Sequence, residues 1–99
     1  MSKTSLKDLA LGLAAPWRST IVGKAGGATL KVLRMDDAAY SEEVHDFDEA
    51  LLVIDGQLRL DIEGRCVEVE AGELYIVPAG QPHAVAPGSR GTLVIIDRC

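Results

Sequence analysis

The chain has 99 residues, of which 47% are apolar and 25% are charged, and it carries a net charge of −5 at neutral pH. This length suits a single domain, and an acidic surface repels phosphate backbones, so we expect no nucleic-acid partner. The longest apolar runs, such as residues 50–54, are too short to cross a bilayer, so we expect no membrane partner either.

The N-terminal residues predict one short helix. Three leucines fall at helical spacing across residues 5–14, and Ser5 with Asp8 three positions later resembles a capping arrangement. Pro16 ends the helical pattern. We therefore expect residues 1–27 to form a helical segment and a lead-in to the main domain.

From residue 28 onward the apolar residues alternate with polar ones, which indicates half-buried strands. We expect strands over residues 28–32, 50–54, 58–62, 66–69, 73–77, 83–85 and 92–96. Asp55–Gly56 reads as a hairpin turn, because glycine supplies the positive φ that such turns need. Short strands separated by glycine and proline predict an all-β sandwich or barrel.

Two segments each carry one of the two histidines of the chain near glycine residues. The segment 72–83 reads Gly-Glu-Leu-Tyr-Ile-Val-Pro-Ala-Gly-Gln-Pro-His and places His83 three positions after Gly80. The earlier segment carries His45, and an apolar strand separates it from Gly56. Two strand ends that each bear a histidine predict a site assembled inside a β-barrel.

Carboxylates flank the earlier histidine. Glu43 precedes His45 by two positions on an extended segment, so both side chains project from one face, and Glu49 follows at an even spacing. Two imidazoles with a carboxylate form a ligand set of non-haem iron and related sites, and a second carboxylate would suit Mn, Fe, Ni or Zn. The alternative is that these acids belong to a solvated loop and that His83 is only a hydrogen-bonded polar residue.

The later histidine segment resembles the second motif of the cupin family, G-x5-P-x-G-x2-H-x3-N. Gly72, Pro78, Gly80 and His83 match the motif, and Pro87 stands where asparagine is usual. The resemblance of the whole chain is to small single-domain cupins. It implies a double-stranded β-helix, or jelly-roll, barrel over residues 28–99 behind the N-terminal helix.

The earlier segment is similar to the first cupin motif, H-x-H-x3,4-E-x6-G. His45 falls on its second histidine and Glu49 on its glutamate, whereas Glu43 stands where the first histidine would be. Such positions hold one divalent ion in metal-binding cupins, so the resemblance implies His45, Glu49 and His83 as metal ligands. Glu43 is a departure that can also ligate, and it changes the charge and geometry of the site.

Three interpretations are compatible with this resemblance. The first is a metal-dependent oxygenase or isomerase that acts on a small polar metabolite. The second is a metal-free binding or sensor module, and the third is a scaffold with an inactive pocket. The replacement of a histidine by Glu43 lowers the expectation of catalysis, and the sequence names neither the metal nor the small-molecule ligand.

The small core and the resemblance both favour a homodimer. Residues 50–54 are apolar on both faces, which places them between two layers or at an interface. Trp17 is expected to pack against the barrel or a partner chain rather than to bind a ligand. The N-terminus lacks a long hydrophobic stretch with a clear cleavage site, so we expect a cytoplasmic protein.

Overall fold

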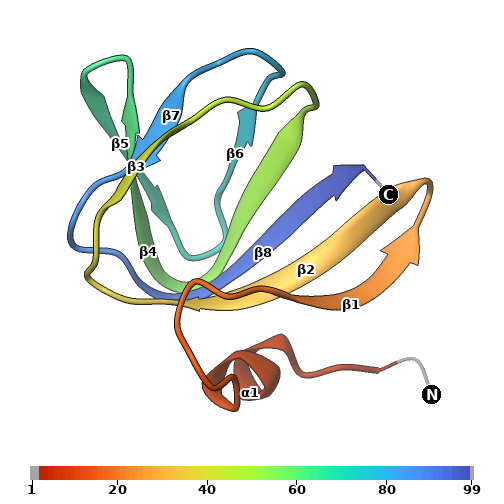
Figure 1. Cartoon of the computed structure of the whole chain (residues 1–99). Coiled ribbons are helices and arrows are strands. Elements are labelled where there is room, and N and C mark those ends of the chain that lie inside the picture. Colours follow the sequence, from red (N-terminus) through yellow and green to blue (C-terminus); the bar gives the residue numbers. More distant parts are fainter. Residues whose placement is uncertain (1–2, 99) are drawn as a thin grey trace.

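The computed structural model describes residues 3–98, which form one short helix and an antiparallel β fold (Figure 1). The elements are α1 (Leu6–Leu11), β1 (Thr20–Ala25), β2 (Ala28–Met35), β3 (Tyr40–Glu43), β4 (Glu49–Ile62), β5 (Arg65–Glu70), β6 (Leu74–Val77), β7 (His83–Val85) and β8 (Arg90–Arg98). The all-β fold with an N-terminal helix is confirmed. No helix within the described residues has the length and apolar character needed to span a membrane.

The strands follow the order β1-β2-β8-β4-β7-β3, and β5 and β6 both pair with β4. Strand β4 is long enough to serve two parts of the sheet: its first residues pair with β6, and residues 57–62 pair with β5. The sheet curls around an interior, so that β3 and β7 lie across from β1 and β2 (Figure 1). The two halves of β4 therefore connect both sides of the barrel.

The apolar core fills the inside of the curled sheet. Its buried members are Leu33, Met35, Leu51, Val53, Leu58, Leu60, Ile62, Val69, Val77 and Leu93. A second cluster lies on the outer face, where Leu52 and Ile54 pack around Ala10 of α1. Residues 50–54 thus lie between two layers, as predicted, and the helix of the same chain covers their outer face.

Helix α1 begins as predicted and ends earlier than predicted. The Ser5 side chain accepts a hydrogen bond from the Asp8 amide at 3.4 Å, which caps the first turn. The helix ends at Leu11 rather than continuing to residue 14. Beyond this point Arg34 of β2 donates to the Leu13 carbonyl oxygen at 2.6 Å, so a side chain from the sheet satisfies a carbonyl that another helical turn would have used.

The prediction of a hairpin turn at Asp55–Gly56 is wrong, because β4 continues through both residues. Gly56 has a φ of +79°, and a Cβ atom there would lie 2.0 Å from the Arg90 carbonyl oxygen. The same steric clash would arise at Gly91, where an added Cβ atom would lie 2.1 Å from the Asp55 carbonyl oxygen. The glycine signal thus marks an irregular register where β4 and β8 approach closely, and not a chain reversal.

Two strands were not predicted from the sequence. Strand β1 lies in the lead-in before residue 28 and pairs with β2, with a register shift between Ile21 and Gly23. Strand β3 is exposed along its four residues and pairs with β7. Neither strand shows a clean alternation of apolar and polar residues, which is the signal on which the other predictions rest.

Candidate metal centre and cavity

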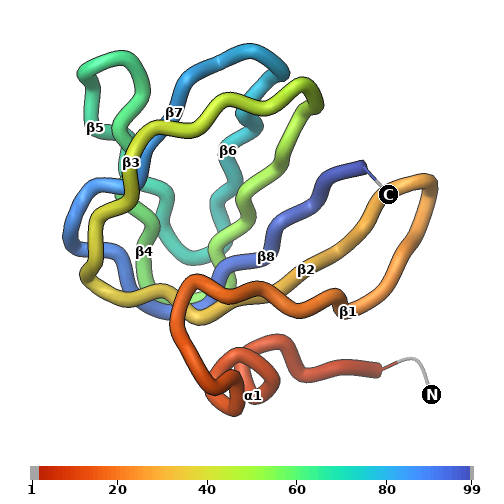
Figure 2. Tube along the Cα trace, viewed as in Figure 1, coloured from red at the N-terminus to blue at the C-terminus, as the bar shows by residue number. Residues whose placement is uncertain are grey.

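Backbone and side-chain hydrogen bonds hold the two histidine segments together. The Gly80 amide donates to the His45 carbonyl oxygen at 2.8 Å, and the Ala79 amide donates to Asp48 Oδ1 at 2.9 Å. The β3–β4 segment and the turn before β7 therefore run side by side at one end of the molecule (Figure 2). These two hydrogen bonds, from Gly80 to His45 and from Ala79 to Asp48, fix the Pro-x-Gly turn to the loop that carries His45, and we call them the clamp.

Strand pairing and the loop after β3 bring three side chains close together. Glu43 at the end of β3 is the register partner of His83 at the start of β7. Glu43 Oε1 lies 3.2 Å from His45 Nε2. One ligand atom from each of Glu43, His45 and His83 lies within 4.8 Å of the other two. Three of the four residues predicted as metal ligands are thus gathered in one cluster.

His83 is fixed by its neighbour in the chain. Its Nδ1 lies 3.1 Å from the Gln81 carbonyl oxygen, and its side chain is 8% exposed. A carbonyl oxygen only accepts hydrogen bonds, so Nδ1 carries the hydrogen and Nε2 of the neutral ring keeps a free lone pair. This is the usual arrangement of a histidine that binds a metal through one nitrogen.

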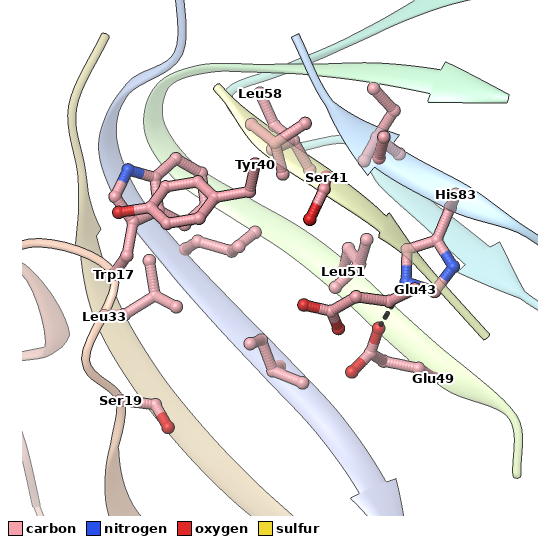
Figure 3. A pocket seen from close by; sticks show the side chains of 15 residues that line it. Trp17, Ser19, Leu33, Tyr40, Ser41, Glu43, Glu49, Leu51, Leu58 and His83 are labelled. Atoms are coloured by element: carbon pink, nitrogen blue, oxygen red, sulfur yellow. Dashed lines mark ion pairs between the residues drawn. The ribbon is translucent and has the colours of Figure 1, made fainter. Parts of the chain in front are cut away.

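Glu49, the fourth predicted ligand, approaches the cluster through His83 and is not a member of it. Its Oε1 lies 3.6 Å from His83 Nε2, which is longer than a hydrogen bond (Figure 3). Burial raises the pKa of Glu49 above 4.5, and the nearby imidazoles of His45 and His83 offset this only in part. A cation between the Glu49 carboxylate and the His83 ring would accept a lone pair from Glu49 Oε1 and another from His83 Nε2.

The cluster suits a divalent transition metal by donor type, and two separations in and beside it are close to the spacing of metal ligands. Two imidazole nitrogens and carboxylate oxygens suit Mn, Fe, Ni or Zn. Bonds of about 2.0–2.1 Å place neighbouring ligand atoms about 3 Å apart around one ion. The 3.2 Å separation of Glu43 and His45 meets this spacing, and the 3.6 Å separation of Glu49 and His83 needs only a small contraction.

The ring of His45 is held from outside the cluster. It stacks on Phe47 with ring centroids 4.9 Å apart and an interplanar angle of 18°. The Arg98 guanidinium lies 5.0 Å from the Phe47 centroid, and the same side chain pairs with Asp46 at 3.0 Å. Strand β8 therefore helps to position a candidate ligand with which it has no sequence proximity.

A cavity of about 310 Å³ opens beside the cluster (Figure 3). Its lining is Trp17, Ser19, Leu33, Tyr40, Ser41, Glu43, Glu49, Leu51, Leu58, Leu60, His83, Ala84, Val85, Leu93 and Ile95. The carboxylates and His83 lie at one end, and Trp17 and Tyr40 lie at the other. The cavity is therefore mostly apolar with one polar end, which is the common form of a small-molecule site.

Sequence reasoning missed the aromatic end of this cavity. Trp17 packs against the core, as predicted, but it also lines the cavity with Tyr40, and their ring centroids are 5.2 Å apart. Trp17 precedes every strand, so only tertiary contact reveals this role.

Comparisons with known proteins agree with the observed fold. A cupin-2 domain protein from Shewanella frigidimarina is 20% identical, with a TM-score of 0.87 over 97% of this chain and 94% of that chain. Protein NMB1881 from Neisseria meningitidis is 20% identical, with a TM-score of 0.83 over 98% of this chain and 99% of that chain. A cupin superfamily protein from Desulfitobacterium hafniense is 19% identical, with a TM-score of 0.74 over 97% and 91%.

These three structures show the fold alone at such identities. No curated protein matches the chain. The family model for the cupin domain matches residues 33–97, which is well over half of the sequence and includes all four candidate ligands. The chain therefore belongs to the cupin family, and its cupin domain takes up most of the sequence.

Proposed function

We propose that this protein binds one divalent transition metal through Glu43, His45 and His83, with Glu49 as a fourth ligand, and holds a small molecule in the adjoining cavity. The observation that carries the proposal is the convergence of three ligand atoms within 4.8 Å of one another. The fixed Nδ1 of His83 supports it, because the free Nε2 is the nitrogen that lies beside Glu49.

Such a metal would supply Lewis-acid or oxygen-binding chemistry at the polar end of the cavity. The protein side chains would orient the ligand and exclude water, since aliphatic residues make up most of the remaining wall. An oxygenase or isomerase activity on a small metabolite is consistent with this division of roles. The structure supports the division by placing His83 and Glu49 directly on the cavity wall.

A metal-free binding or sensor module is the second candidate. The distances of 3.2 Å and 3.6 Å between the histidines and glutamates also suit imidazolium–carboxylate pairs, which need no metal. Such pairs would leave the cavity as a simple binding site. The two candidates differ in one measurable property, which is stoichiometric metal.

The test is elemental analysis of purified wild type beside His45→Ala and His83→Ala. We expect about one Mn, Fe, Ni or Zn per wild-type chain and little in either variant. Glu43→Gln and Glu49→Gln should weaken binding about tenfold or more, because each removes a charged ligand. The control is Glu42→Gln, an exposed acid next to Glu43 and outside the cluster. Absence of metal after reconstitution would leave the metal-free module.

We also propose that the protein forms a homodimer. Leu74 and Ile76 on β6 are 54% and 57% exposed, which gives an apolar surface that a second copy could cover. Residues 50–54 do not support the dimer, because α1 covers their outer face. Light scattering at several concentrations would test the dimer, and a monomer throughout would contradict it. The cytoplasmic location stays a prediction.

A further inference from the structure

The carboxylates on the cavity wall are not balanced by any lysine or arginine among the described residues that line it. Of the described residues that line it, Glu43 and Glu49 are the acidic ones, and none is lysine or arginine. Two cations of strands β2 and β8 are already engaged elsewhere: Lys31 Nζ lies 2.9 Å from Asp97 Oδ2, and Arg98 pairs with the loop acid Asp46 at 3.0 Å. An organic anion that entered the cavity would meet two carboxylates, with no lysine or arginine in the described part of the wall to offset them.

A bound divalent metal would not give the site a net positive charge. The carboxylates of Glu43 and Glu49 together would cancel the charge of a divalent ion, so the loaded site would be neutral. A histidine at position 43, as in the first cupin motif, would leave one positive charge for an anionic ligand. The glutamate at position 43 therefore removes the attraction that an anion would otherwise feel.

The far end of the cavity favours a ring. Trp17 and Tyr40 meet at an interplanar angle of 58°, and aliphatic side chains continue the wall. Trp17 Nε1 donates to Asp36 Oδ1 at 2.7 Å, so the indole offers its aromatic surface to a ligand and not its N–H group. A cavity of about 150 Å³ holds benzene. The 310 Å³ here has room for a substituted ring.

We propose that the cavity binds a neutral, ring-sized, largely apolar molecule whose hydrogen-bond donors face Glu43 and Glu49, and that Glu43 excludes organic anions. This rests on the proposed function for the metal-loaded protein. In the metal-free protein the same selectivity is expected, because the described wall carries two glutamates and no lysine or arginine, and pairing with the two histidines would at most balance the glutamates. The ligand class can therefore be tested whether or not a metal binds.

The test compares two probes of nearly equal shape, neutral 4-hydroxybenzamide and anionic 4-hydroxybenzoate. Trp17 is the single tryptophan of the chain and lines the cavity, so its fluorescence reports occupancy. Both probes are titrated into metal-free and zinc-loaded protein at neutral pH, and calorimetry checks the fluorescence. We expect the amide to bind at least about tenfold more tightly than the carboxylate in both forms.

Variants assign the selectivity to one residue. Glu43→His should reduce the amide-to-carboxylate affinity ratio by at least about tenfold, because one negative charge leaves the cavity wall. Glu42→Gln removes the same charge from an exposed position beside it and should leave the ratio within about twofold. The comparison separates the position of the charge from the net charge of the protein.

Three outcomes would overturn the ligand class: equal or tighter binding of the carboxylate by wild type, no binding of either probe, or an unchanged ratio in Glu43→His. A wild-type protein that takes up no metal but still prefers the amide would contradict the metal proposal and support the ligand class. Stoichiometric metal together with tight carboxylate binding would support the metal proposal and contradict the ligand class.

Discussion

The Gly80 amide donates a 2.8 Å hydrogen bond to the carbonyl oxygen of His45, and this bond joins the two histidine segments of the chain. It is a backbone contact, so its formation depends on the path of the chain and not on either side chain. The Asp48 side chain reinforces it by accepting from the Ala79 amide at 2.9 Å. The geometry of the candidate metal site therefore depends on a loop-to-turn clamp as well as on the ligands.

Asp48→Ala tests the clamp. The substitution removes one exposed side-chain to backbone hydrogen bond, which should lower the free energy of unfolding by about 1 kcal/mol. Metal affinity should fall about tenfold, because the loop that carries His45 is held less firmly. Chemical denaturation and metal titration measure the two effects. Asp37→Ala, in the exposed β2–β3 loop, is the matched control, and equal metal affinity in both variants would contradict the clamp.

Phe47→Leu tests how His45 is oriented. Leucine keeps an apolar side chain but removes the ring that stacks on His45 at 4.9 Å and underlies Arg98. We expect metal affinity to fall several-fold, while the midpoint of thermal unfolding changes little because the ring is outside the main core. Phe47→Tyr keeps the stacking and should behave as wild type. Wild-type affinity in the leucine variant would show that the stacking has no positioning role.

Glu49→Gln should change how stability depends on pH in the metal-free protein. Burial raises the pKa of Glu49 in the folded state above 4.5. Its contribution to stability is fully present below pH 4.5 and is lost as the pH rises through the folded pKa. The glutamine variant should therefore be more stable than wild type at pH 7, and the advantage should disappear on acidification. Thermal unfolding across this range measures it.

Asp55→Asn is the control of opposite sign. Burial alone would raise the pKa of Asp55, but hydrogen bonds from Thr92 and the charge of Lys7 outweigh it and hold the pKa below 3.8. Its contribution is present above pH 3.8 and is lost as the pH falls through the folded pKa. This variant should therefore be less stable than wild type at pH 7. The same sign of change at pH 7 in both variants would refute the electrostatic account.

Gly56→Ala should destabilise the fold severely. The new Cβ would lie 2.0 Å from the Arg90 carbonyl oxygen, and the residue has a φ of +79°. We expect a loss of at least about 3 kcal/mol in the free energy of unfolding, because backbone must move as well as adopt a strained angle. Gly72→Ala isolates the angle, since Gly72 has a φ of +84° but open space around its Cβ position. It should cost about 1–2 kcal/mol. Similar losses in both variants would contradict the close-approach explanation.

The amino-acid sequence determined the parts of the molecule that depend on local pattern. Leu58, Leu60 and Ile62 alternate with polar residues and form the buried face of β4, as predicted. The turn glycines at positions 64 and 72 have positive φ and connect the strands that the sequence predicts there. Alternation and turn chemistry involve neighbours in the chain, so they can be interpreted without knowing the fold.

Motif spacing also identified the histidines that the structure brings together. His45 and His83 were predicted as ligands from their place in two cupin-like segments, and both lie in the cluster with Glu43. Glu49 was predicted on the same grounds, and it stands beside His83 at 3.6 Å. Its role as a ligand stays a prediction, because distance to one neighbour does not establish coordination.

Only the tertiary structure decided the remaining features, because each depends on a contact between distant segments. Gly56 has the local signature of a hairpin turn, and the approach of β8 makes it a point of close contact within a strand. Trp17 lies far in sequence from His83, and the curvature of the sheet places it at the opposite end of the cavity from His83 (Figure 3). The close approach of β4 and β8 and the shape of the cavity arise from packing between distant segments, which no local pattern encodes.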